Sequence, residues 1–307
     1  MSLMKRWRPS LAWHEALWGF IFISPWIVGF LALQVGPMIA SLVLSFTEYQ
    51  IVAPPKFIGL ANYIKMFTAD ASFVDALKVT FTYGIVSVPL QLVAGLLVAL
   101  LMNQKVPALQ LWRTIYYLPN VVSGVSVAML WVWIFHSQFG LINLVLRVTL
   151  GIQGPAWLGH PSWALPALIL MSLWSVGSSM IVNLAGLQGI PTELYEAASI
   201  DGATWWHRFW KVTLPMLSPV MFFNLVMGVI GSFQYFTNAY VMTGGGPGRA
   251  TLFYNLYLYN NAFLYYKMGY ASALAWVMFV IILVFTLLIF KSSPLWVYYE
   301  GTVARGR

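Results

Sequence analysis

The chain has 307 residues, of which only 8% are charged, whereas about 25% of the residues in an ordinary soluble domain carry a charge. Hydrophobic residues make up 60% of the chain, and the mean hydropathy is +0.78. This composition excludes an ordinary soluble protein. The chain contains no cysteine, so the sequence offers neither a disulfide framework nor a thiolate metal site. The net charge of +8 is spread through short loops and tails, so nucleic acid is not an expected partner.

Seven stretches of 17 or more residues contain no charged side chain. An apolar helix of about 20 residues crosses a hydrocarbon core about 30 Å thick. Six segments reach that length without turn residues, so the sequence predicts an all-α integral membrane protein with six transmembrane helices, at residues 17–36, 79–102, 114–135, 164–187, 214–236 and 268–290. Segment 141–152 is too short and carries Arg147, and segment 252–264 is interrupted by three asparagines. We expect interfacial or loop structure in both.

Lysine and arginine residues near the ends of spans stay cytoplasmic far more often than they cross the membrane. Ten of these residues fall on the side of the two termini: Lys5, Arg6, Arg8, Lys105, Arg113, Arg208, Lys211, Lys291, Arg305 and Arg307. Six fall on the other side: Lys56, Lys65, Lys78, Arg147, Arg249 and Lys267. Both termini are therefore predicted to be cytoplasmic, with tails at residues 1–16 and 291–307 around a transmembrane domain at residues 17–290.

This orientation places the first, third and fifth connections outside. The first connection, residues 37–78, is the longest, and its segment 41–46 is expected to be an amphipathic piece lying against the outer surface. The basic N-terminus followed by an apolar run resembles a signal peptide. The run is long and lacks a small-residue cleavage pattern, so we expect an uncleaved first span.

The predicted spans contain no acidic or basic side chain, although ion-driven transporters usually carry such groups inside the membrane. The chain also lacks a GxxxxGK[ST] phosphate loop. The glycine-rich run 243–249 has no following lysine, and we expect a tight external turn there. Energy for uphill transport, if any is used, must therefore arrive from outside the lipid. The four histidines are scattered over different connections and span ends, so no catalytic residue, metal site or cofactor is predicted.

The fourth connection, residues 188–214, is predicted to form two short helices on the cytoplasmic face. Pro191 suits a first helical turn, Gly202 can supply the positive φ of a helix C-terminus, and Thr204 can cap the second helix. Pro215 would end that helix or open the fifth span. Periodicity alone leaves open a simple interfacial anchor at this position.

The same residues resemble the EAA signature of the permease subunits of binding-protein-dependent ATP-binding-cassette importers. The matching positions are Glu196-Ala197-Ala198, Asp201-Gly202-Ala203, Phe209, Val212 and Leu214-Pro215. Segments 57–63, 113–119, 131–135 and 243–247 are similar to the carbohydrate-uptake branch, to the first permease subunit of maltose, lactose and glycerol-phosphate importers. The resemblance covers residues 17–291 and implies a maltose-type permease fold in a bacterial or archaeal inner membrane.

The resemblance implies that the EAA loop docks into an ATPase subunit and transmits its motion to the spans. By this likeness Glu196 makes a polar contact with the ATPase, Ala197 and Ala198 allow close packing, and Gly202 sets the bend. The implied partners are a second, non-identical permease subunit, two ATPase subunits and an extracytoplasmic solute-binding protein that docks on the external loops. The chain itself is then a transport subunit and not an enzyme.

A sugar in a membrane pathway needs hydrogen-bonding partners and aromatic faces. The candidates on the fourth and fifth spans are Trp174, Ser175, Ser178, Ser232, Gln234, Tyr235 and Asn238. Ordinary interspan packing would also explain serines and interfacial aromatics at these positions. A secondary transporter, a channel or a membrane enzyme are the rival classes. Within the family, a glycerol-phosphate or polyol importer remains an alternative to a sugar importer.

Overall fold

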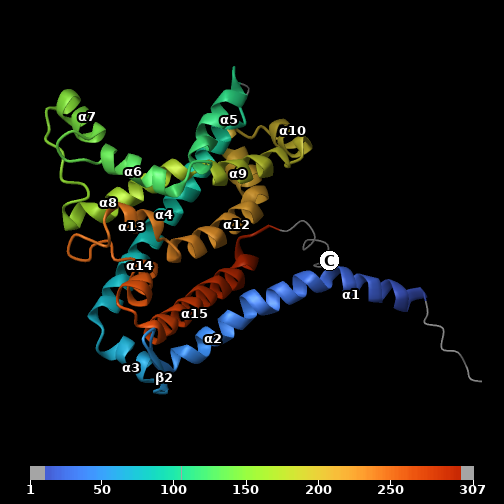
Figure 1. The fold of residues 1–307 in the computed structure, drawn as a ribbon. Helices are drawn as coiled ribbons and strands as arrows, with labels where there is room; N and C mark the ends of the chain where they lie inside the picture. The colour runs from blue at the N-terminus through green and yellow to red at the C-terminus, as the bar shows by residue number, and fades with distance from the viewer. Residues whose placement is uncertain (1–10, 105, 299–307) are drawn as a thin grey trace, which may run out of the picture.

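The computed structural model describes residues 11–104 and 106–298, which form a mostly helical molecule (Figure 1). Most of the two predicted tails therefore lies outside the described residues, together with six of the cations counted above: Lys5, Arg6, Arg8, Lys105, Arg305 and Arg307. Four helices are long and apolar enough to cross a membrane, and two bent helix pairs raise the number of candidate spans to six.

The first segment is a single helix of 35 residues from Leu11 to Ser45, which extends away from the rest of the chain as an arm (Figure 1). It consists of α1 (Leu11–Phe30), a π-helical turn η1 (Leu31–Val35) and α2 (Gly36–Ser45). The wider π turn, in which the Gly36 amide donates to the Leu31 carbonyl, lets the helix continue through Pro37. The expected separate piece at 41–46 is thus wrong, because residues 41–45 belong to this helix.

A two-stranded antiparallel hairpin follows, with β1 (Thr47–Gln50) paired to β2 (Ala53–Phe57) and Thr47 opposite Phe57. The all-α prediction missed this hairpin, which is too short and exposed to show in a hydropathy pattern. Helix α3 (Ala61–Thr68) comes next, and the Asn62 side chain holds it to the end of the arm by donating to the carbonyls of Ser45 and Thr47, both at 2.9 Å.

The 32-residue helix α4 (Ala71–Met102) is the centre of the molecule and packs against α8, α9, α12 and α14. Asp70 caps it by accepting a hydrogen bond from the amide of Phe73. Glycines on α4 permit close contact with its neighbours: a Cβ on Gly95 would lie 2.6 Å from the Ser179 hydroxyl of α9.

The third predicted span is broken. Helix α5 (Leu109–Tyr117) continues as the turn η2 (Leu118–Asn120), and α6 (Gly124–Ile134) then leaves at 95° to it. Pro119 and Gly124 flank the break, so residues 114–135 do not form one continuous helix, and a span there stays a prediction. A short apolar helix, α7 (Leu141–Leu150), follows within the third connection.

The fourth span bends by 44° between α8 (Pro161–Ser172) with its turn η3 (Leu173–Ser175) and α9 (Gly177–Gln188). The bend brings Gly177 against the broken third span. A Cβ on Gly177 would lie 2.4 Å from the Tyr116 carbonyl oxygen, so only glycine fits this contact.

The fourth connection starts with α10 (Thr192–Ile200). It continues with α11 (Trp205–Arg208) and the π turn η4 (Phe209–Thr213), which runs without a break into α12 (Leu214–Phe233). The second predicted short helix therefore begins at its predicted cap, Thr204, but does not end at Pro215. It is the start of the fifth span, since the π turn accommodates Pro215 inside a helical run from Trp205 to Met242 that includes α13 (Thr237–Met242).

The chain ends with α14 (Tyr254–Tyr259), the π turn η5 (Asn260–Leu264), α15 (Met268–Ser292) and the turn η6 (Ser293–Leu295). Residues 254–264 are helical and partly buried, with Tyr254 fully buried, so the expectation of a loop is wrong there, whereas the interfacial position stays a prediction. The asparagines do not break the helix, because Asn261 is itself buried and donates to the Tyr257 carbonyl at 2.9 Å.

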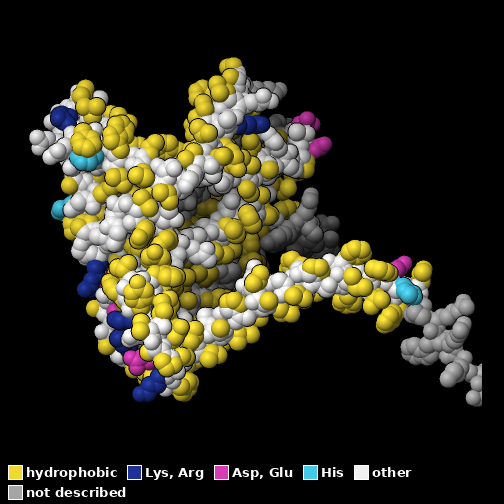
Figure 2. Space-filling model, viewed as in Figure 1, with side chains coloured by type: hydrophobic (Ala, Val, Ile, Leu, Met, Phe, Trp, Pro, Cys, Tyr) yellow, Lys and Arg dark blue, Asp and Glu magenta, His cyan; other side chains and the backbone are white. Residues whose placement is uncertain are grey.

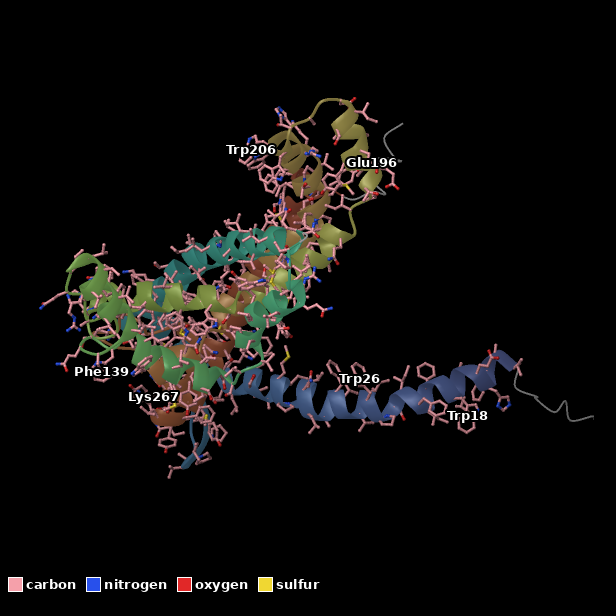
Figure 3. The ribbon with its side chains drawn as sticks, turned by 90° about the horizontal axis from the view of Figure 1, so that it is seen from above. Trp18, Trp26, Phe139, Glu196, Trp206 and Lys267 are labelled. Carbon is pink, nitrogen blue, oxygen red and sulfur yellow. The ribbon has the colours of Figure 1, made fainter. Side chains whose placement is uncertain are left out.

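Charged side chains gather at the tips of the molecule, and hydrophobic ones cover the body and the arm between them (Figure 2). Figure 3 shows Glu196 and Trp206 at one end and Phe139 and Lys267 at the opposite end. Two buried clusters hold the helices together. The larger one contains Phe73, Phe253 and Tyr254, and the smaller one contains Leu96, Met180 and Leu217 beside the fourth connection.

Candidate functional site

A polar groove runs along α4 between the end of α8 and α12. It consists of two adjoining cavities of about 280 and 170 Å³, which share Gln91, Ser175 and Gly228 among their lining residues. The polar side chains that line the groove are Tyr83, Ser87, Gln91, Ser172, Ser175, Ser178, Ser179, Asn224, Ser232, Tyr235 and Asn238. No ionisable carboxylate or amine is among them.

Two of these hydroxyl groups, Ser87 Oγ and Tyr235 Oη, are buried and have no hydrogen-bond partner among the residues that the structure describes. Ser87 is 0% exposed. An aromatic wall stands beside them, where the rings of Tyr83 and Tyr235 lie 4.5 Å apart and Phe253 packs on both. Because unpaired buried hydroxyls are costly, the groove presents hydrogen-bonding capacity that a polar, uncharged ligand can use.

The structure brings together five of the seven pathway residues predicted from the sequence. Ser175, Ser232, Tyr235 and Asn238 line the larger cavity, and Ser178 lines the smaller one. Ser178 also donates to Asn120 of the broken third span at 3.1 Å. Gln234 does not line the groove and is exposed, with its backbone carbonyl accepting from Asn255.

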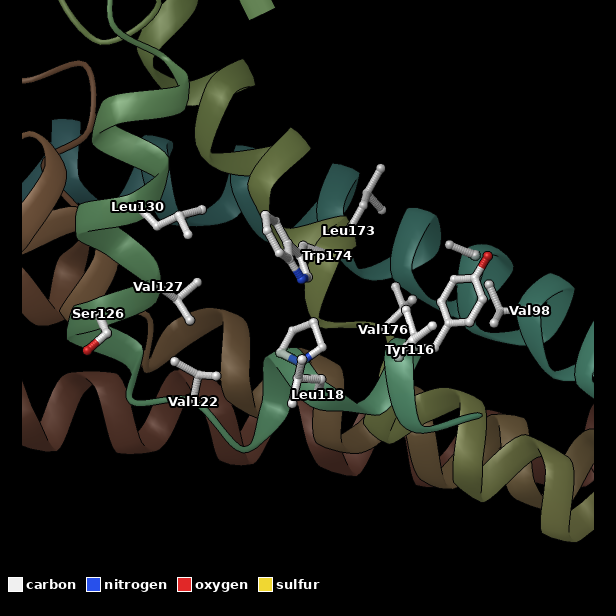
Figure 4. A pocket seen from close by; sticks show the side chains of 13 residues that line it. Val98, Tyr116, Leu118, Val122, Ser126, Val127, Leu130, Leu173, Trp174 and Val176 are labelled. Carbon is white, nitrogen blue, oxygen red and sulfur yellow. The ribbon is translucent and has the colours of Figure 1, made fainter. Parts of the chain in front are cut away.

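Trp174 lies in a different, apolar cavity of about 700 Å³ in the angle of the broken third span. Figure 4 shows its ring near Leu130, Leu118 and Leu173. The ring also stands edge-on to Trp131 with 5.1 Å between centroids. Both Trp174 and Ser175 belong to the turn η3, but Trp174 lines the apolar cavity and Ser175 lines the polar groove. The two residues therefore do not share one surface although they are adjacent in sequence.

Sequence reasoning missed the contribution of α4. Tyr83, Ser87 and Gln91 lie at intervals of four residues, which places them on one helical face toward the groove. This polar stripe in an otherwise apolar span is a signal that the sequence contained.

The fourth connection forms a rigid elbow, defined here as residues 190–213. Gly202 has φ +74, in the left-handed region, and its amide donates to the Ser199 carbonyl at 3.1 Å, while the Ala203 amide donates to Ala198 at 2.9 Å. Thr204 accepts from the His207 amide and so caps α11. The predicted bend and cap are both confirmed.

Two side-chain contacts connect α10 to the segment α11–η4 of the elbow. The hydroxyls of Tyr195 and Thr213 lie 3.1 Å apart, and Arg208 donates to the Ser199 hydroxyl at 3.2 Å.

The outer face of α10 stays uncovered, since Glu196 and Ala197 are exposed and Ile200 is 87% exposed. In the described part of the chain, Glu196 has no ion-pair partner. Ala198 is half-buried, Asp201 is exposed, and Leu214 and Pro215 lie in the first turn of α12.

The elbow is directly continuous with the groove, because α9 leads into it and α12 leaves it. Between these helices Asn224 donates to Asn183 at 3.0 Å, and Asn183 is 1% exposed. The elbow thus lies between two helices that line the groove.

Asp70 organises the opposite end. Its carboxylate accepts hydrogen bonds from the hydroxyls of Tyr257 and Tyr270, which joins α4 to α14 and α15. Burial raises the pKa of Asp70, but these hydrogen bonds and that of the Phe73 amide outweigh the burial and hold the pKa below its usual value. Burial, and then the bond to Asp70, raise the pKa of Tyr257 to about 12. Among the described residues no cluster of three or more His, Asp or Glu side chains could hold a metal ion.

Comparison with known proteins gives consistent matches over most of the chain. Residues 91–294 match the family model described as the inner membrane component of binding-protein-dependent transport systems. The probable ABC transporter permease protein YesP of Bacillus subtilis is 49% identical over 290 residues, covering 94% of both chains. The trehalose/maltose transport system permease protein MalF of Thermococcus litoralis is 35% identical over 287 residues, covering 92% of this chain and 95% of the relative.

A solved structure is similar in fold as well. The crystal structure of a bacterial alginate ABC transporter, in complex with an alginate pentasaccharide-bound periplasmic protein, contains a chain with a TM-score of 0.81 and 26% sequence identity. The match covers 91% of this chain and 95% of the other. These relatives are transport components rather than enzymes, as predicted from the sequence. The chain therefore belongs to the inner membrane components of binding-protein-dependent ABC importers, as a multi-pass permease subunit.

Proposed function

We propose that this permease provides half of the translocation pathway for a carbohydrate and is driven by an ATPase docked on its elbow. The proposed topology has six spans in residues 17–290 and both terminal tails, 1–16 and 291–307, in the cytoplasm. Counting each bent helix pair as one span supports six. The opposite positions of Glu196 and Lys267 in Figure 3 support the alternation of connections between two sides.

The polar groove is the observation that carries the choice of substrate. It combines unpaired hydroxyls, amide side chains and an aromatic wall, and it contains no charged group, which suits a neutral hydroxyl-rich molecule. The relative named for trehalose and maltose transport points to the same class, and the alginate transporter points to carbohydrate in general, since alginate is an acidic polysaccharide. We propose Ser175, Ser178, Ser232, Tyr235 and Asn238 as substrate contacts, joined by the α4 stripe. A contact of Trp174 or Gln234 with the substrate stays a prediction.

We propose that α10 is the docking element for the ATPase. Its uncovered face offers Glu196 for a polar contact, the small Ala197 and Ala198 for close approach, and Ile200 for apolar contact. Asp201 and Gly202 end the helix, and Leu214-Pro215 joins the elbow to α12. The two side-chain contacts between α10 and the segment α11–η4 support an elbow that moves as one rigid unit.

A second permease subunit is proposed for two reasons. The groove is open along its side, since Ser175 and Met227 are exposed, so a further surface is needed to close a pathway. The arm has no buried residue in α1 although it is apolar on all sides, which leaves a partner subunit or lipid to cover it. The proposed assembly adds two ATPase subunits and an extracytoplasmic solute-binding protein.

Reconstitution tests this proposal. The chain, its partner permease, the ATPase and the binding protein are assembled in proteoliposomes, and uptake of a labelled sugar is followed with and without ATP. We expect uptake that needs ATP and all four components and that resists collapse of the membrane potential. Uptake by this chain alone without nucleotide would refute the proposal. Calorimetry of the binding protein with sugars, polyols and glycerol-phosphate identifies the substrate class.

A further inference from the structure

A second polar cavity, unconnected with the groove, lies in the third connection. This cavity, here called the polar cradle, has a volume of about 280 Å³. It is lined by Ser137, Gln138, Asn143, Arg147, Gln153 and Gly154. The polar cradle lies between α7 and the two chain segments that flank it, at the end of the molecule where Figure 3 shows Phe139 and Lys267. It is therefore at the far end from the elbow.

Asn143 makes the polar cradle rigid. This side chain is 3% exposed, and its Nδ2 donates to the carbonyl of Ser137 at 2.8 Å and to that of Pro155 at 3.1 Å. Its Oδ1 accepts from Trp157 Nε1 at 2.7 Å. A Cβ on Gly154 would lie 1.9 Å from Asn143 Oδ1, so glycine is required there. The two chain segments on either side of α7 are thus fixed to one another.

Arg147 is the only charged residue of the cradle. One guanidinium nitrogen, Nη2, donates to the Gln138 carbonyl at 3.0 Å and so orients the group, while the side chain remains exposed. In the described part of the chain it has no ion-pair partner. The sequence contains no acidic residue between Asp75 and Glu193. A planar guanidinium held in this way is suited to bind a carboxylate through two parallel hydrogen bonds.

Charge at this end favours an acidic partner. The connections here carry six basic and three acidic side chains: Lys56, Lys65, Lys78, Arg147, Arg249 and Lys267 against Glu48, Asp70 and Asp75. Two of the acids are already engaged, since Asp75 pairs with Arg249 at 3.1 Å and Asp70 accepts from two tyrosines. The net positive field attracts a negatively charged surface.

The faces of α7 distinguish a protein partner from lipid. Leu141, Leu144, Val145 and Val148 form an exposed apolar face, which fits the membrane interface, and Leu150 at the end of the helix is exposed as well. Arg147 lies roughly 110° around the helix from the centre of that face. If the apolar face contacts lipid, the cradle opens toward the aqueous phase.

We propose that the polar cradle receives an aspartate or glutamate side chain of the solute-binding protein, with Arg147 as its counter-ion. This inference rests on the proposed function, which places this end outside the cell, and it assigns the docking contact to one particular external connection. The contact secures the binding protein on the permease and does not touch the substrate.

The test uses the complete importer in proteoliposomes. ATP hydrolysis is measured against the concentration of substrate-loaded binding protein for the unsubstituted complex, Arg147→Glu and Arg147→Lys. Lys56→Glu is the matched control, because it makes the same charge change at the same end outside the cradle. We expect Arg147→Glu to raise the half-saturating concentration about fivefold or more, in line with a rim ion pair, and Lys56→Glu to change it less than about twofold. Arg147→Lys should lie between them. An Asp→Lys or Glu→Lys change in the binding protein should restore the Arg147→Glu complex.

Several outcomes would overturn the inference. Equal effects of Arg147→Glu and Lys56→Glu would mean a general field and no specific site. A change in the dependence on anionic lipid, with an unchanged half-saturating concentration, would assign the cradle to a lipid phosphate. A change only in the substrate concentration dependence would make it a substrate site. If the binding protein does not stimulate even the unsubstituted importer, the proposed function itself is wrong.

Discussion

Gly202 provides a direct test of the elbow. Its φ of +74 lies in the left-handed region, and no atom lies within 4 Å of a Cβ added there. The change Gly202→Ala therefore costs only the backbone term, about 1–2 kcal/mol for a residue with a Cβ. That free energy reduces the population of the bent elbow relative to unbent forms by about five- to thirtyfold. We expect a corresponding loss of sugar uptake per ATP hydrolysed, with membrane insertion and complex assembly intact.

Gly59 offers a matched control at the opposite end. It has φ +57 and also has no atom within 4 Å of an added Cβ, so Gly59→Ala has a similar backbone cost away from the elbow. The assay is ATP-dependent uptake and ATP hydrolysis by the reconstituted importer, measured side by side for both variants. If Gly202→Ala transports as well as Gly59→Ala, the elbow does not couple the ATPase to the groove.

Three further changes test the groove and the packing around it. Ser87→Ala removes a buried hydroxyl without adding an atom; we expect normal thermal stability and a KM for uptake raised about five- to tenfold, the value of one hydrogen bond of ~1–1.4 kcal/mol. Gly177→Ala places a Cβ 2.4 Å from the Tyr116 carbonyl oxygen, so we expect a loss of about 1–3 kcal/mol, visible as a lower Tm. Asp70→Asn removes the charged acceptor of two tyrosines, and we expect a loss of about 1–3 kcal/mol. Because the pKa of Asp70 is lowered in the folded chain, its contribution is present above the unfolded pKa of about 4 and disappears as the pH falls below it. The Tm difference between Asp70→Asn and the unsubstituted chain should therefore be constant from pH 5 to 8 and shrink below about pH 4. An unchanged Tm or KM would contradict the corresponding contact.

Hydropathy and charge predicted six apolar segments, and helices lie in each of them, because the need for about 20 apolar residues is a local property. The angles within the third and fourth segments are not local. Pro119 and Gly177 are visible in the sequence as helix breakers, but the 95° and 44° bends depend on how these two segments pack on each other. The helix of the arm is longer than the predicted span at 17–36, because a π turn allows Pro37 inside a helix.

The elbow was predicted in greater detail than the groove. Gly202 and Thr204 act through their own backbone and nearest neighbours, so their roles follow from residue type and spacing. The separation of Trp174 from Ser175 arises from the turn η3, and the sequence gives no sign of it. The α4 stripe required the knowledge that α4 packs against both α9 and α12.

The contacts around the groove indicate how a displaced elbow can alter it. Asn183 and Asn224 are bonded within the bundle, where breaking a hydrogen bond leaves groups with few alternative partners, so α9 and α12 are expected to move together. Their contacts with α4 involve small residues, with Gly95 against Ser179 and Gly228 against Val88. The same helices also interlock through the buried cluster that contains Leu96, Met180 and Leu217. Movement of the α9–α12 pair along α4 would shift Ser175 and Ser232 past Ser87 and Gln91, and so change which hydroxyls meet in the groove. In the proposed mechanism the elbow therefore needs no contact with the substrate to control its binding.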